Sequence, residues 1–537
     1  MKPFLLAKLI SLLTLLCFGF VLFQTPWPFT LILSIFFSLL FSFLNCWLVP
    51  GGFAWSKSNH HRFPKLRGPM GWPVLGAIPE MAGPLAHRKL ADLAASFGSK
   101  RLMALSLGFT RVVISSHPET AKEILGGSSF TDRPIKDSAR LLMFERAIGF
   151  APAGAYWRHL RRIAAVHMFS PRRIASLEVL RQRVAYEMLA RVGVEMGERG
   201  FVGLRGILQK GSLTNVLESV FGTRLGLEKE AGQRLGEMVN EGYELISKFN
   251  LEDYFPLRFL DFFGVKRKCH RLAAKVKSAV GQIVKERKTS LVGGECYNNF
   301  MSGDDHEIND YLSALLALPK EDQLSDSDMV AILWELIFRG TDTVAILLEW
   351  IMARMVLHQD IQTKVQQEID TCIGGNRHVR DSDIPNLPYL QAVVKEVLRL
   401  HPPGPLLSWA RLAVHDVHME KVFIPAGTTA MVNMWAITHD ASIWKDPWAF
   451  KPERFIEEEV TIMGSDLRLA PFGSGRRVCP GKALGLATVH LWLARLLRQY
   501  RWLPAQPVDL SERLRLSMEM KKPLACHAVC RLNNATP

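Results

Sequence analysis

Apolar positions recur with helical spacing along most of the chain, and short alternating stretches lie between them. The predicted helices cover residues 118–125, 155–200, 272–288, 361–373, 387–400 and 483–500. Ser325 is placed to cap another helix, long and apolar, which runs to about Leu357. The pattern therefore predicts a mainly α fold.

Small β-sheets complete this prediction. Residues 102–107 and 111–114 alternate around Gly108, which predicts a hairpin. Residues 422–432 are typical of a strand and a turn, and the C-terminal tail is rich in strand-forming residues. The polar stretch at 291–310 predicts a surface loop.

The longest apolar pattern lies at the N-terminus, where no charged residue occurs between Lys8 and Lys57. Two blocks, residues 4–23 and 29–48, each approach the ~20 residues that a membrane-spanning helix needs. A cleaved signal peptide is the less favoured alternative, because no cleavage site with small residues follows the first block. We therefore expect a membrane anchor at 1–50 with one or two transmembrane helices, a choice that the sequence leaves open.

Basic residues follow the anchor and predict that the large remainder lies in the cytosol. Residues 51–80 are rich in proline and glycine and predict a stiff linker. The catalytic domain is then expected to cover 81–537.

Composition narrows the class of protein. The 537 residues are 48% hydrophobic and 22% charged, which excludes a disordered chain. The net charge of +15 suits an acidic partner or an anionic membrane, but no dense basic arm indicates nucleic acid. Eight scattered cysteines indicate free thiols in a reducing compartment rather than a disulfide scaffold.

One of these cysteines, Cys479, precedes the last apolar helix in a glycine-rich segment. A thiolate at a helix N-terminus is stabilised by free N–H groups and by the helix dipole. Gly475 permits a tight turn, Gly481 allows a flat ligand to approach the backbone, and Arg477 is suited to a carboxylate on that ligand. An inert buried thiol is the common alternative for a lone cysteine.

The segment resembles the haem-binding signature F-x-x-G-x-R-x-C-x-G of the cytochrome P450 family at all five fixed positions. These positions are Phe472, Gly475, Arg477, Cys479 and Gly481. The resemblance implies that Cys479 is the axial ligand of the iron in haem b (iron protoporphyrin IX). It also implies the cytochrome P450 fold.

Further family motifs appear in order. Glu396 and Arg399 match E-x-x-R, and Arg454 lies in a P-E-R-F segment; the resemblance implies that these three support the haem pocket structurally. Trp157 and Arg161 match W-x-x-x-R, whose helix contacts a haem propionate, and Arg411 lies where plant members carry a basic residue near the other propionate.

The oxygen-binding side is expected within the long helix, where residues 339–344 resemble the family pattern A/G-G-x-D/E-T-T/S. Gly340 would leave room for dioxygen, and Asp342 with Thr343 would relay protons. Arg339 and Val344 depart from the pattern. Because a cation beside haem is costly unless paired, we expect Arg339 to point away from the pocket, with pairing to an acidic substrate as the alternative.

The resemblance covers nearly the whole chain and is greatest to a plant group associated with control of organ growth. It implies a monooxygenase of the endoplasmic reticulum that inserts one oxygen of O₂ into a C–H bond of a small lipophilic substrate, with fatty-acid hydroxylation as the proposed activity. Electrons would come from NADPH through a flavoprotein reductase, NADPH–cytochrome P450 reductase. A haem-thiolate isomerase or dehydratase and a non-catalytic membrane haem protein are the alternatives. Pocket residues are expected in 144–150, 242–249 and 405–408.

Overall fold

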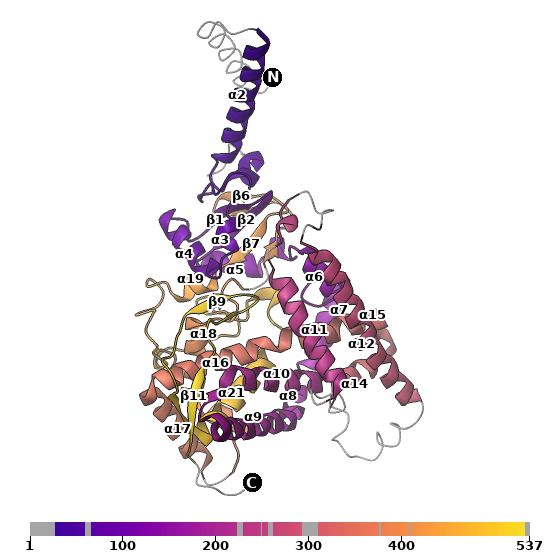
Figure 1. Cartoon of the computed structure of the whole chain (residues 1–537), viewed down its shortest axis with the longest axis vertical. Coiled ribbons are helices and arrows are strands. Elements are labelled where there is room, and N and C mark those ends of the chain that lie inside the picture. The colour runs from indigo at the N-terminus through magenta and orange to yellow at the C-terminus, as the bar shows by residue number, and fades with distance from the viewer. Residues whose placement is uncertain are drawn as a thin grey trace.

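A computed structural model describes residues 27–58, 66–222, 229–248, 250–255, 261, 263–292, 310–374, 377–407 and 410–531. The first apolar block and most of the expected loop at 291–310 lie outside these residues. Figure 1 shows a body in which helices predominate and an N-terminal helix that projects from one end. The predicted mainly α fold with small sheets is confirmed.

The helices of the N-terminal half begin and end as follows. They are α2 (Trp27–Trp47), α3 (Ile78–Met81), α4 (Ala86–Ser96), α5 (Pro118–Gly126), α6 (Asp137–Leu142), α7 (Ala155–Ile163), α8 (Pro171–Ser176), α9 (Glu178–Arg199), α10 (Leu204–Phe221), α11 (Glu230–Ser247) and α12 (Val265–Val292). The tract expected to be helical from 155 to 200 is thus divided: a π-helical segment, η3 (Ala164–Met168), follows α7, and Pro171 starts α8 at its first position.

The helices of the C-terminal half include α15 (Asp326–Gly340) and α16 (Asp342–Leu357), which carry the expected oxygen-binding side and are called the distal helices below. The others are α14 (Tyr311–Leu316), α17 (Gln359–Ile373), α18 (Pro388–Leu400), α19 (Met434–Thr438), α20 (Arg454–Glu457) and α21 (Lys482–Gln499). Ser325 caps α15 by accepting from the N–H of Asp328, as predicted. The long helix expected to continue to Leu357 is broken at Thr341 into α15 and α16.

In the described part of the chain, four small sheets lie around these helices. The strands are β1 (Met103–Leu107), β2 (Thr110–Ser115), β3 (Val202–Gly203), β4 (Arg411–Leu412), β5 (Val417–Met419), β6 (Val422–Ile424), β7 (Thr429–Val432), β8 (Tyr500–Pro504), β9 (Glu512–Leu514), β10 (Met518–Met520) and β11 (Ala525–Cys530). The largest sheet has the order β1-β2-β7-β4, with the predicted hairpin β1–β2 pairing Met103 with Ile114. β2 and β7 are parallel, which joins distant parts of the chain.

Buried apolar side chains on α15, α16, α18 and α21 form the centre of the body. Trp334, Trp350 and Trp492 are among its largest fully buried side chains. Burying such side chains is worth about 1.5–3 kcal/mol each or more, so this centre holds the helices that carry the site in fixed positions.

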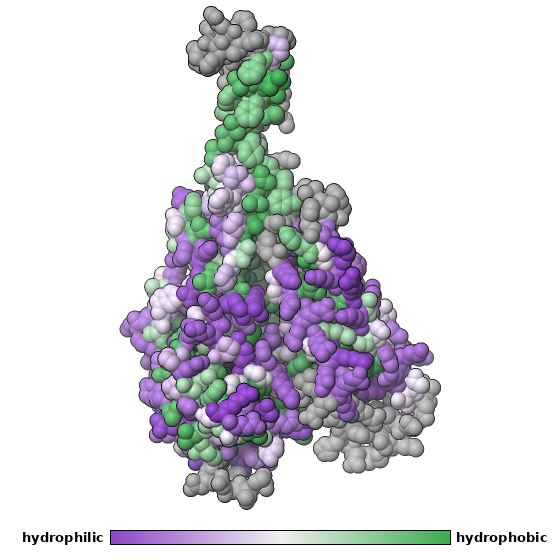
Figure 2. Space-filling model, viewed as in Figure 1, coloured by the Kyte–Doolittle hydropathy of each residue, from purple (hydrophilic) through white to green (hydrophobic). Residues whose placement is uncertain are grey.

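The second apolar block of the sequence forms α2, which Figure 2 shows as a hydrophobic column outside the polar body. Large side chains on it are exposed, among them Phe29, Ile32 and Leu39. Among the described residues, however, no helix combines the length and the apolar character that a membrane crossing requires.

Candidate active site

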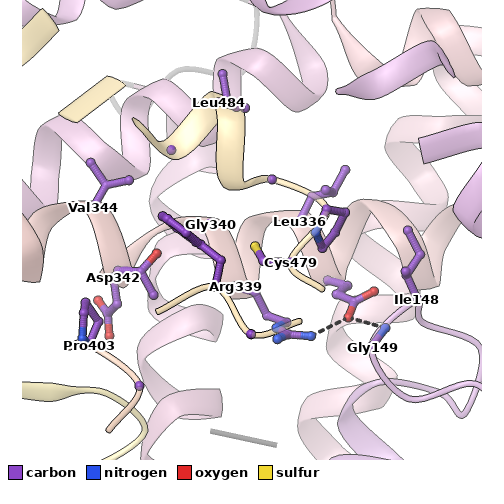
Figure 3. Close-up of a pocket in the computed structure, with 18 of the residues that line it drawn as sticks. Ile148, Gly149, Leu336, Arg339, Gly340, Asp342, Val344, Pro403, Cys479 and Leu484 are labelled. Carbon is purple, nitrogen blue, oxygen red and sulfur yellow. Dashed lines mark hydrogen bonds and ion pairs between the residues drawn. The ribbon is translucent and has the colours of Figure 1, made fainter. Parts of the chain in front are cut away.

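One cavity of about 350 Å³ lies between the segment of Cys479 and the junction of α15 with α16. This volume is within the range of ligand-binding pockets. Figure 3 shows the Cys479 sulfur facing the same space as Gly340 and Asp342. All three expected pocket stretches contribute to its lining, through Ile148, Tyr243 and Leu407 among others. The fold thus brings together motifs that are far apart in the sequence.

The segment that carries Cys479 is held by backbone geometry. Gly475 has φ +69°, and a Cβ there would collide with the main-chain oxygen of Leu125, so only glycine fits. A short 3₁₀ turn follows at Gly475–Arg477, and the Cys479 N–H donates to the oxygen of Phe472 over 3.0 Å. This folded loop places the thiol before the first turn of α21.

The thiol of Cys479 is buried, and positively charged side chains lie near it. Burial raises its pKa, while Arg339, the backbone N–H of Gly481 and Arg161 act in the opposite direction. A buried thiol surrounded by donors and cations is suited to binding a metal as thiolate, because the metal itself supplies the positive charge that burial requires.

Four arginines line the cavity on the side of Cys479: Arg133, Arg161, Arg411 and Arg477. Burial is the largest cause of a lowered pKa for each, well below the usual value for Arg133 and to about 10 for both Arg411 and Arg477. Their mutual repulsion contributes at Arg133, Arg411 and Arg477. Such a cluster of buried cations calls for anionic groups between them.

Main-chain oxygens already orient these guanidinium groups. Arg477 donates to Thr131 over 3.0 Å and to Ala151 over 2.7 Å, and Arg161 donates to Val478 over 3.0 Å. Arg411 donates to the oxygen of Ser474 over 3.1 Å. These three arginines are therefore held in place by the protein and do not depend on a ligand for their orientation.

Trp157 is packed into this cluster. Its ring lies 4.5 Å from the Arg477 guanidinium carbon, and its indole N–H donates to the oxygen of Ile148 over 3.0 Å. The motif resemblance implies that the helix of Trp157 contacts a haem propionate. Trp157 lines the cavity, and its indole N–H cross-links the loop before α7.

On the opposite wall, Gly340, Asp342 and Thr343 all line the cavity. A Cβ on Gly340 would lie 3.1 Å from Val216 of α10, so a larger residue would press on that helix. Burial raises the pKa of Asp342 to about 6, with Glu519 as a further cause and Arg205 opposing it. An acid that titrates near neutral pH, beside a hydroxyl, is a suitable proton relay.

Arg339 does not point away from the pocket, which corrects the expectation from the sequence. It lines the cavity, and its Nη1 donates to Glu335 Oε1 over 3.1 Å on the same helix. The same oxygen accepts from the N–H of Gly149 over 2.8 Å, as the dashed lines in Figure 3 show. The free-energy cost of placing the Arg339 cation in the cavity wall is offset, because the largely buried carboxylate of Glu335 pairs with it.

Outside the cavity, Glu396 and Arg399 form a fully buried pair on α18, joined by two hydrogen bonds of 2.8 Å. Arg454 approaches the same carboxylate to 3.1 Å. Arg399 also donates to the main-chain oxygens of Thr438 and Pro447. This network ties α18 to the segment that follows α19.

The Cytochrome P450 family matches residues 66–527, which is most of the chain. This chain belongs to the cytochrome P450 family. The relatives include "Cytochrome P450 78A5" of Arabidopsis thaliana, 53% identical over 92% of this chain and 94% of that protein, and "Cytochrome P450 78A6" of the same plant, 49% identical over 94% and 95%. "Flavonoid 3'-monooxygenase" of Arabidopsis thaliana is 34% identical over 89% of this chain and 93% of that protein.

Solved structures agree on the fold. A zebra fish cytochrome P450 with abiraterone superposes with a TM-score of 0.69 at 23% identity, covering 84% of this chain and 100% of that one. This P450 is a monooxygenase, as its motifs predict.

Haem, the cofactor of this family, fits the residues that are present. The buried arginine cluster is complementary to the two haem carboxylates. Within the described part of the chain, a Cβ on Gly481 would meet no atom closer than Phe169 at 3.5 Å, and one on Gly485 none within 4 Å. Both glycines line the cavity, so these small residues leave space there for a flat ring.

Sequence reasoning missed three contributors to the site. Arg133 was given no role from the sequence, and Glu335 precedes Arg339 by about one helical turn. Gly149 lies in the expected stretch 144–150, but its role as a main-chain donor to Glu335 was not foreseen. The i, i+4 spacing of Glu335 and Arg339 could have predicted their ion pair. No sequence pattern indicates the Gly149 contact, because it depends on how a loop folds over α15.

Proposed function

We propose that this P450 hydroxylates a lipophilic carboxylic acid, such as a medium- or long-chain fatty acid, at a membrane of the endoplasmic reticulum. The cavity that brings Cys479 opposite Gly340, Asp342 and Thr343 carries the proposal. Electrons would come from NADPH through a flavoprotein reductase. The product would serve in control of plant organ growth, as in the plant group that the sequence resembles.

In this proposal Cys479 would bind the haem iron through its thiolate. Arg161, Arg411 and Arg477, together with Arg133, would hold the haem carboxylates, while the glycines at 475 and 481 shape the loop and leave space for the ring. When bound, haem supplies the activation of O₂ and the insertion of one oxygen atom into a C–H bond. The protein supplies the thiolate that binds the iron, the positive charges that hold the haem carboxylates, and the orientation of the ring.

Asp342 and Thr343 deliver protons to the oxygen-binding position beside Gly340. The raised pKa of Asp342, about 6, allows the carboxyl to take a proton from solvent and release it near neutral pH. The Thr343 side chain is exposed towards the cavity, where it can pass the proton on.

The lining of the cavity supports a long apolar substrate. Its apolar wall includes Val216, Val220, Leu336, Leu347, Leu407 and Leu516. Arg339 is the cation on the distal wall, and its pairing with Glu335 keeps the guanidinium oriented. A fatty acid matches both features, because its chain needs an apolar wall and its carboxylate needs a fixed cation.

Turnover tests the proposal directly. Microsomes that contain this P450 and a plant reductase receive NADPH and a panel of fatty acids, and products are identified by mass spectrometry with Cys479→Ala as the control. We expect hydroxy acids from the wild type alone. Absence of product together with a normal thiolate-type carbonyl spectrum would refute fatty acids as the substrate class.

A matched substrate pair tests Arg339. Arg339→Gln should lower kcat/KM for a fatty acid about 10- to 100-fold, as expected from loss of a charged hydrogen bond of about 1.5–3 kcal/mol. The corresponding fatty alcohol should change little. Equal losses on acid and alcohol would show that Arg339 acts through the shape of the pocket.

Membrane attachment is proposed through α2. Its exposed apolar side chains, such as Ile32 and Leu39, would otherwise face water at a large hydrophobic cost. The variant Ile32→Lys/Leu39→Lys should release more protein from microsomes at high salt than the wild type. Unchanged release would place the attachment elsewhere in the chain.

The reductase is proposed to dock on the side of Cys479, where Arg158, Arg162 and Arg476 are exposed. Lys482 lies nearby and donates to the oxygen of Met463. Charge reversal of Arg476 and Lys482 to Glu should slow reduction and weaken its dependence on salt. Unchanged reduction rates would refute this docking surface.

A further inference from the structure

The distal helix is interrupted where its chemistry lies. α15 ends at Gly340 and α16 begins at Asp342, with Thr341 between them. In an unbroken α-helix the oxygen of Phe338 accepts from the N–H of Asp342. A break here leaves main-chain groups of the ladder that need other partners.

Side chains supply these partners. The Thr341 hydroxyl donates to the oxygen of Ile337 over 2.7 Å, and Ser212 of α10 donates to the oxygen of Thr341 over 2.5 Å. Such hydroxyl-to-carbonyl contacts accompany bends in helices. Both hydroxyls stabilise the broken form from within the protein.

Tyr243 of α11 provides the decisive contact. Its hydroxyl donates to the oxygen of Phe338, which is the acceptor that the N–H of Asp342 would use in an unbroken helix. The backbone of Asp342 is close enough to act on the pKa of Tyr243. The hydroxyl therefore occupies the Phe338 oxygen at the break. A side chain inserted into the ladder in this way is a recognised cause of helix kinks.

The position of Tyr243 is fixed by close packing. Its ring lies 4.6 Å from that of Phe338, and both face the interior. The neighbouring Gly242 allows this approach, since a Cβ there would lie 2.6 Å from the Phe338 ring. The hydroxyl proton is used on the Phe338 oxygen, so Tyr243 holds the backbone and does not itself donate the proton for the reaction.

We infer that Tyr243 is a positioning residue: its hydroxyl holds the distal helix open at Asp342 and links the proton relay to α11, which lines the substrate cavity. The catalytic part of this inference rests on the proposed function. Burial raises the pKa of Tyr243 well above its usual value, so the hydroxyl remains protonated at every working pH. Loss of the hydroxyl leaves the Phe338 oxygen open to water and loosens the break, and Asp342 and Thr343 then shift relative to the oxygen-binding position.

Tyr243→Phe removes this hydroxyl alone. The control is Tyr500→Phe, because the Tyr500 hydroxyl also donates to a helix carbonyl, that of Leu189 over 3.3 Å, outside the cavity lining. Amide hydrogen exchange of the haem-loaded full chain is followed by mass spectrometry over residues 338–343. We expect about tenfold faster exchange in Tyr243→Phe and no change there in Tyr500→Phe. Unchanged exchange in Tyr243→Phe overturns the inference whatever the substrate is.

The coupling between NADPH consumption and product formation provides the functional readout. Tyr243→Phe should convert a severalfold smaller share of the consumed NADPH into product and release the rest as hydrogen peroxide, with a KM close to that of the wild type. Product formation driven by added peroxide should be retained, because RH + H₂O₂ → ROH + H₂O requires no reductase electrons and no proton delivery to O₂. Equal loss in both assays would mean a packing role only and overturn the inference.

The two proposals fail differently. If the wild type forms no product from fatty acids, the proposed substrate class is wrong, and the hydrogen-exchange comparison still decides the inference about Tyr243. If the wild type forms product and Tyr243→Phe remains fully coupled, the proposed function stands and the inference fails.

Discussion

The charge of Asp342 is predicted to destabilise the fold that contains it. Burial raises its pKa from 3.8 to about 6. The folded state therefore binds this proton more tightly than the unfolded state, so stability falls as the pH rises from about 4 to 6 and the full cost is present above that range. A shift of about two pKa units corresponds to about 3 kcal/mol at pH 7.5.

Asp342→Asn removes the charge and keeps the shape of the side chain. We expect the free energy of unfolding to increase by up to about 3 kcal/mol at pH 7.5, and by about half of that at pH 5, where much of the wild-type carboxyl is protonated in the fold. Urea unfolding at several pH values measures this difference. Product formation should fall about 10²-fold or more, because the proton relay is lost.

Asp360→Asn is the matched control, since Asp360 is an exposed carboxylate at the start of α17. The free energy of unfolding of the Asp360→Asn variant should stay within about 0.5 kcal/mol of that of the wild type. If Asp342→Asn is no more stable than the wild type at pH 7.5, or if its gain is the same at pH 5, the reasoning from buried charge is refuted.

Three further substitutions test the supporting structure. Arg399→Ala should cost about 3–5 kcal/mol, because it removes the fully buried partner of the Glu396 carboxylate and leaves only Arg454 beside it, whereas Arg468→Ala, at a partly exposed ion pair, should cost about 0–1 kcal/mol; urea unfolding compares them. Gly475→Ala should abolish the thiolate-type carbonyl spectrum, while Gly473→Ala, which has a similar φ but open space around it, should only weaken it; equal spectra would contradict the clash. Trp157→Phe keeps a ring over the arginine cluster but loses the indole donor, so it should cost about 1 kcal/mol and retain haem.

Local sequence patterns predicted the elements that depend on local physics. Helical periodicity placed 483–500, found as α21, and 387–400, found as α18, to within a residue or so. The hairpin around Gly108 and the Ser325 cap were also predicted, because turns and caps are determined by a few neighbouring residues. α10 and α11 were not predicted, and they pack against the distal helices through tertiary contacts.

For the site, the sequence by itself determined the chemistry: a cysteine before α21, an acid and a hydroxyl in the distal helix, and a set of arginines. Residue type and spacing suffice for that, since they decide which groups are available. Only the tertiary structure decided what those groups contact. It turned Arg339 into the cavity against Glu335, and it inserted the Tyr243 hydroxyl into the helix break. The second of these contacts, like that of Gly149 with Glu335, joins segments distant in the chain, so it depends on packing, which no local pattern records.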